Sequence, residues 1–190
     1  MAPKLSTTDA TCEAFFNQQH FIYGRELLPF CLRHWILLTA LKSPLIIGGK
    51  VELHDMRLAV ITCSTKTDSE FMEACSFASE EWAVWKRVTG LMNTDKAFTA
   101  FNRYVEDYLP QFPFWKNLEE SSDSKLDGFL VTAARLLDSC TPDYVENMPL
   151  GKMLVWAMAK NEAEGFPNKN LMSDFDVETI RSNPAFAEAM

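Results

Sequence analysis

The sequence has few of the residue clusters on which catalysis and metal binding depend. It contains only three histidines and seven glycines in 190 residues. No glycine-rich turn of the phosphate-binding or dinucleotide-binding kind is present, and no Gly-x-Ser-x-Gly nucleophile elbow occurs. These absences argue against nucleotide hydrolysis, dinucleotide-dependent redox chemistry and serine hydrolysis.

Basic residues and long apolar runs are also scarce. Lys and Arg number 18 against 26 Asp and Glu, a net charge of −8 that repels phosphate backbones and anionic lipids, so we expect neither nucleic acid nor a membrane as a direct partner. The most apolar window, residues 35–47, is interrupted by Lys42 and Pro44 and is shorter than the ~20 residues of a membrane span. The first residues lack the apolar region of a secretory signal, so we expect a cytoplasmic location.

The cysteines are odd in number, five, and widely spaced. This pattern favours reduced thiols packed as small apolar side chains. Cys31 and His34 lie three residues apart on one predicted helix, and a site could assemble with Glu52 and His54 of the next one. Because a metal site needs three or four converging ligands and no second Cys-His pair exists, we predict no metal, no cofactor and no catalytic residue. We expect His34 to be partly buried and bonded to a backbone group.

Apolar residues at helical spacing are what the sequence has in abundance. They predict an all-α fold, a multi-helix bundle of about seven to eight helices that could form two sub-bundles. Leu45–Ile47 could instead be a short extended piece. The predicted helices are an opening one from Thr8 or Asp9 to about His20, and others at 29–42, 51–64, 67–90, 94–109, 126–140, from 142, 149–164 and 175–181.

A long connection at residues 110–124 provides the best internal boundary. It separates an N-terminal bundle, residues 1–109, built around the central helix 29–42, from C-terminal helices at 125–190 that we expect to pack on the first part. Phe112, Phe114 and Trp115 lie in this connection, where the backbone is expected at the surface. Large apolar groups there either fold back on the helices or contact a partner, and these three are our predicted partner-binding residues.

Part of the N-terminal half resembles a known group of proteins. The residues concerned are Tyr-Gly-Arg-Glu-Leu-Leu-Pro-Phe-Cys-Leu-Arg-His at 23–34, Leu-Lys-Ser-Pro at 41–44 and Ala-Val-Ile-Thr-Cys-Ser at 59–64. They resemble small helical tail-assembly proteins of tailed phages and phage-like particles, of the tail assembly chaperone type. The resemblance implies a role in building a tail in the host cytoplasm, by holding a tape-measure type protein or as a small structural component. It includes no catalytic signature and transfers no site residue.

Together these patterns predict a non-enzymatic protein that binds another protein, with tail assembly as the narrower hypothesis. Two alternatives stay open at this point. One is a helical metal-dependent enzyme using Cys31, His34 and His54, and the other is a bacterial regulatory domain that binds a protein. The oligomeric state is also open, because a buried stripe and a dimer-facing stripe have the same sequence pattern.

Overall fold

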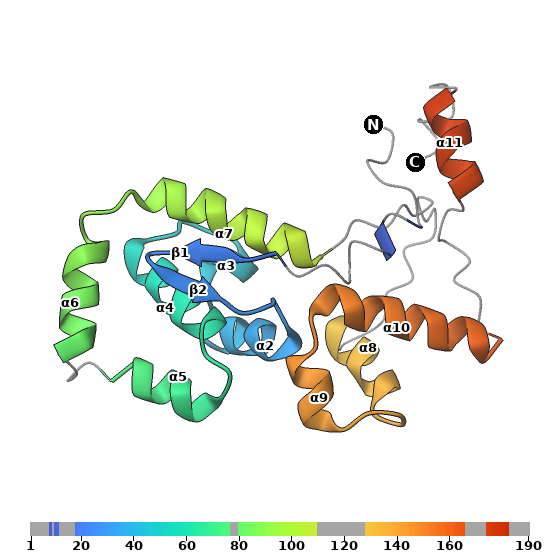
Figure 1. Cartoon of the computed structure of the whole chain (residues 1–190), viewed down its shortest axis with the longest axis horizontal. Helices are drawn as coiled ribbons and strands as arrows, with labels where there is room; N and C mark the ends of the chain where they lie inside the picture. The colour runs from blue at the N-terminus through green and yellow to red at the C-terminus, as the bar shows by residue number, and fades with distance from the viewer. Residues whose placement is uncertain are drawn as a thin grey trace. The chain divides into compact units, whose positions relative to one another are not determined.

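The computed structural model describes residues 8, 10–11, 18–76, 80–109, 128–165 and 174–182. It divides into two compact units (Figure 1). The hairpin unit consists of residues 17–108 with 146–149, and the C-terminal unit consists of residues 1–16, 109–145 and 150–190. The predicted connection at 110–124 lies outside the described residues. The packing of 125–190 on the first part stays a prediction.

Helices make up most of the described chain, and two short strands form one antiparallel sheet. None of the helices in the described part is long and apolar enough to cross a membrane. In chain order the elements are β1 (His20–Ile22), β2 (Arg25–Leu27), α2 (Leu32–Ala40), α3 (Pro44–Ile47), α4 (Leu53–Cys63), α5 (Asp68–Ala74), α6 (Glu80–Thr89), α7 (Thr94–Tyr108), α8 (Gly128–Leu136), α9 (Pro142–Asn147), α10 (Leu150–Ala163) and α11 (Asp174–Ser182).

The β-hairpin corrects the all-α prediction and the predicted extent of the first helix. Residues 18–19 are not helical, and His20, where the helix was expected to end, begins β1. Tyr23 and Gly24 connect the strands with φ angles of +53° and +76°. Positive φ at both central residues is the geometry of a two-residue hairpin turn, because it matches the twist of the strands. Tyr23-Gly24 had indicated only a break in the helical pattern.

The predicted central helix, 29–42, is shorter and less central than expected. α2 begins at Leu32, because Cys31 is extended and pairs with Pro149 in an isolated antiparallel bridge. Its first turn is buried, whereas Ile36 and the following Leu41 are partly exposed. Residues 44–47 form the helix α3 and not an extended piece.

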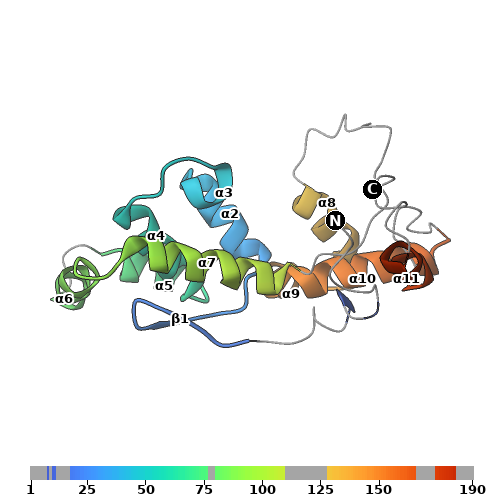
Figure 2. The ribbon, with the colours of Figure 1, turned by 90° about the horizontal axis from the view of Figure 1, so that it is seen from above.

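The predicted helix at 67–90 is two helices, α5 and α6. Phe71 of α5 and Trp82 of α6 nevertheless meet over Ile61 of α4, as one buried apolar cluster. α6 runs across the line of α7 at one end of the hairpin unit (Figures 1 and 2). The apolar repeat was therefore right about the burial of Phe71 and Trp82, but wrong about Val88, which is 46% exposed, and about the continuity of the backbone.

Tyr104 of α7 occupies the centre of the hairpin unit and is fully buried. Its ring makes edge-on contacts with His20 of β1, Phe30 and Tyr108, at centroid distances of 5.3, 5.6 and 5.5 Å. Its hydroxyl donates a 2.7 Å hydrogen bond to the Leu28 carbonyl after β2. One side chain thus joins α7 to the hairpin and to the segment that leads into α2.

The buried face of α7 is offset by one residue from the apolar face that the sequence predicted. Phe101 and Tyr108 are buried as expected, but Phe98 is 36% exposed. Ala97 and Tyr104 complete the buried face, with spacings of four, three and four residues from Ala97 to Tyr108. The predicted face did not include Tyr104, whose buried hydroxyl has the partner it requires in the Leu28 carbonyl.

The C-terminal unit contains α10 packed beside α8 (Figure 1). Lys160 of α10 donates to the Arg135 carbonyl of α8 at 2.6 Å. The Thr8 amide and hydroxyl both donate to the Asp174 carboxylate at the start of α11, at 3.1 and 2.5 Å. The predicted start at Pro142 and the predicted stop at Gly165, whose φ is +82°, are confirmed.

We expect Tyr104→Phe to destabilise the protein while leaving its fold unchanged. Loss of the hydroxyl leaves the Leu28 carbonyl without its donor, so the free energy of unfolding should fall by about 1–2 kcal/mol. Urea denaturation followed by circular dichroism measures this change. Tyr144→Phe, at a tyrosine that is 44% exposed, is the matched control and should change stability by less than about 0.5 kcal/mol. Equal losses in the two variants would contradict the central role of Tyr104.

Candidate functional site

Cys31 and His34 lie together at the start of α2, but not in an arrangement that activates a nucleophile. Both residues are buried. The Nδ1 atom of His34 accepts a hydrogen bond from the Cys31 backbone N–H, at 3.4 Å, so this nitrogen is occupied by a backbone group. The expectation of a histidine with a backbone partner is confirmed, and His34 is more deeply buried than predicted.

The electrostatics of this pair keep both groups uncharged at neutral pH. Burial and the charge of Arg33 lower the pKa of His34 to about 4, and burial raises the pKa of the Cys31 thiol. A reactive cysteine needs the thiolate, which a neighbouring imidazolium normally stabilises. A neutral thiol beside a neutral imidazole is therefore a packing arrangement.

His54, the third residue of the alternative enzyme hypothesis, is exposed in the first turn of α4. Glu52 caps the same helix. Across the described ranges, no group of three or more His, Cys, Asp and Glu side chains is placed to hold a metal ion. Cys31, Cys63, Cys75 and Cys140 are free thiols, and Cys12 lies outside the described residues.

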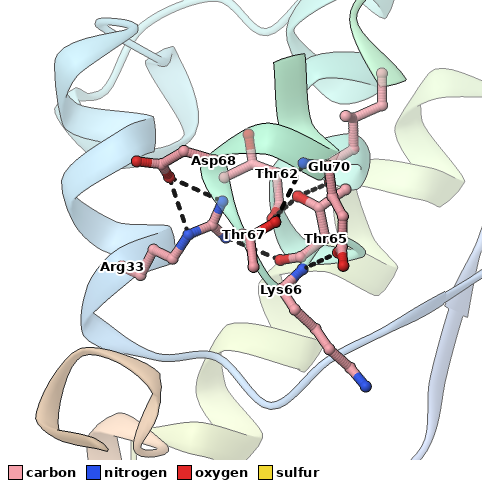
Figure 3. A network of polar contacts seen from close by, with 8 residues as sticks. Arg33, Thr62, Thr65, Lys66, Thr67, Asp68 and Glu70 are labelled. Atoms are coloured by element: carbon pink, nitrogen blue, oxygen red, sulfur yellow. Dashed lines mark hydrogen bonds and ion pairs between the residues drawn. The ribbon is translucent and has the colours of Figure 1, made fainter. Parts of the chain in front are cut away.

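Arg33 forms the main polar network around α2 (Figure 3). Its buried guanidinium donates from Nη1 to the Thr65 carbonyl at 2.8 Å, and from Nε to the Asp68 carboxylate at 3.1 Å. Nη2 lies 3.0 Å from the same carboxylate oxygen, although Asp68 is 79% exposed. The network attaches α2 to the turn between α4 and α5 through two hydrogen bonds, from Nε and Nη1, and the ion pair of Nη2 with Asp68.

The capping box predicted at Thr67 and Glu70 is present in altered form. The Thr67 hydroxyl accepts from the Glu70 amide at 3.2 Å, as expected for an N-cap (Figure 3). The Glu70 carboxylate accepts instead from the Lys66 amide at 2.7 Å, one residue before the cap. The beginning of α5 is thus held by two reciprocal hydrogen bonds.

The inner side of α6 is fixed to the rest of the hairpin unit. Trp82 is buried in the cluster with Ile61 and Phe71. Trp85 donates from its indole N–H to the Tyr23 carbonyl at the hairpin turn, at 3.2 Å, and its ring lies under the Arg25 guanidinium at 5.1 Å. These contacts determine which side of α6 faces the protein.

Arg57, a buried residue of α4, holds the end of α6. Its Nη2 donates to the Lys86 carbonyl at 2.5 Å, and its Nε donates to the Thr89 hydroxyl at 2.7 Å. That hydroxyl in turn donates to the Trp85 carbonyl at 2.9 Å. A cation at the carbonyl end of a helix also interacts favourably with the helix dipole.

The outer side of α6 and the turn after it carry an exposed row of apolar side chains. Val84 and Val88 are 56% and 46% exposed, and Leu91 and Met92 are 89% and 42% exposed. We call these four residues the α6 patch. Val84 and Val88 are neighbours because they lie four residues apart on α6, and Leu91 follows in the turn after the helix, where its amide donates to the Val88 carbonyl at 3.1 Å. Apolar residues gathered in this way, on a helix whose other side is anchored, indicate an interaction surface.

The predicted partner-binding residues Phe112, Phe114 and Trp115 lie outside the described residues and stay a prediction. The α6 patch was missed, because Val88 was assigned to the buried stripe of Trp82 and Trp85. A second row in the sequence, Val84, Val88 and Leu91 at spacings of four and three, was the available signal.

We predict that Arg57→Met loosens α6. The change removes two charge-assisted hydrogen bonds and leaves the Lys86 carbonyl without this donor, so unfolding free energy should fall by about 2–4 kcal/mol. Chemical denaturation measures the loss, and hydrogen exchange should show it largest in α6. Arg87→Met, at an exposed position on the same helix, should stay within about 0.5 kcal/mol of wild type. A similar loss in both variants would show that Arg57 does not anchor the helix.

Stability should fall as the pH decreases from 7 to 5. The pKa of His34 is about 4 in the folded protein and 6.5 when unfolded, so the unfolded state takes up a proton first and gains stability. This difference in pKa predicts that the free energy of unfolding falls by about 2 kcal/mol between pH 7 and pH 5. The pKa of His20 is also lowered, because burial outweighs the opposing effect of Asp107 at 3.2 Å. His20 therefore also contributes to the loss of stability as the pH decreases.

Denaturation curves across this pH range test the prediction. His34→Gln should flatten the dependence, whereas His54→Gln, which alters an exposed side chain, should retain it. An unchanged slope in His34→Gln would be the contrary result.

Comparison with known proteins identifies no relative of this chain. No protein-family model matches the chain, and neither curated proteins nor solved structures yield a match. The chemistry and placement of the chain's own residues are therefore the basis on which its function can be inferred.

Proposed function

We propose that the protein is a non-catalytic interaction protein that binds another protein through the α6 patch. The observation that carries this proposal is the two-sided character of α6. Its inner side is fixed by Trp82, Trp85 and Arg57. Val84 and Val88 remain exposed on its outer side, as does Leu91 in the turn after it. A helix held in place from behind presents its outer row without a large ordering cost on binding.

The state of the buried polar groups favours binding over chemistry. The thiol of Cys31 and the imidazole of His34 are both neutral and buried, and the nearby Arg33 donates to the Thr65 carbonyl and the Asp68 carboxylate. These residues stabilise the hairpin unit, which leaves the surface as the region available for function.

Tail assembly is the narrower form of the proposal. It is supported by the resemblance of residues 23–64 to tail assembly chaperones of tailed phages, and α6 lies outside that range. In this form the partner is a tail or tape-measure type component, and the α6 patch covers an apolar segment of it during assembly.

Substitution of the patch by charge tests the proposal. We expect the double variant Val84→Asp, Leu91→Asp to remain folded, because both side chains are exposed, and to lose its partner. The assay is co-expression with tail components encoded beside the gene, followed by reconstitution of any complex from purified proteins and measurement of its dissociation constant. The expected loss of affinity is on the order of tenfold or more.

Ile47→Asp is the matched control, since Ile47 of α3 is 60% exposed and lies outside the α6 patch. It should bind like wild type. Equal affinity of the wild type and the double variant would remove the α6 patch as the binding surface. If no tail component binds the wild-type protein, the tail-assembly form of the proposal is wrong.

A further inference from the structure

We draw no further inference here: the strongest candidate, the polar cavity of about 270 Å³ at the carboxyl ends of α8 and α10 in the C-terminal unit, carries nothing, because its two basic side chains, Arg135 and Lys160, are already bonded to other side chains of the chain and nothing in the described residues points to a ligand that would replace those contacts.

Discussion

Two buried guanidinium groups hold the helices of the hairpin unit at fixed positions. Arg33 extends from α2 to the Thr65 carbonyl just after α4, and Arg57 extends from α4 to the Lys86 carbonyl near the end of α6. Both acceptors lie near the carboxyl end of a helix, where the dipole is negative, although the Lys86 carbonyl also accepts from the Gly90 amide at 3.2 Å. The same kind of contact thus joins α2 to α4 and α4 to α6.

Arginine suits this role because its planar group offers several donors in fixed directions and stays charged when buried. Each of the two also binds a side chain, Asp68 for Arg33 and Thr89 for Arg57. Burial of a charge is costly unless such partners are present, so the contacts must form together. The position of α6, and with it the exposure of its outer row, follows from this constraint on Arg57.

Local signals in the sequence predicted the helices better than they predicted their packing. Thr67, Pro142 and Gly165 marked helix ends correctly, because a cap or a fixed φ acts within a few residues. The hairpin was missed because its strands have three residues each, too few to show an alternating pattern. Tyr104 was missed because the predicted apolar row, with Phe98 and Val105, is offset by one residue from the buried one, and the Leu28 carbonyl that pairs with its hydroxyl lies 76 residues away in the sequence.

The candidate site was harder to predict than the fold for a related reason. Periodicity shows that Val88 lies near Trp85 on a helix, but only the contacts of Arg57, Trp82 and Trp85 show which side faces inward. The buried pair of Cys31 and His34 presents the opposite case. Their spacing resembles a reactive site, whereas burial raises the pKa of the Cys31 thiol and lowers that of His34, which opposes the thiolate that such a site uses.

The presence of Met92 in the α6 patch has a consequence for redox conditions. Its thioether is partly exposed, whereas Met56 and the thiols of Cys31 and Cys63 are buried. Peroxide would therefore reach Met92 before these groups, and sulfoxide formation would place a polar, chiral group within an apolar row. Oxidation would then weaken the binding proposed for the patch before it affected the stability of the fold, and a methionine sulfoxide reductase would reverse it.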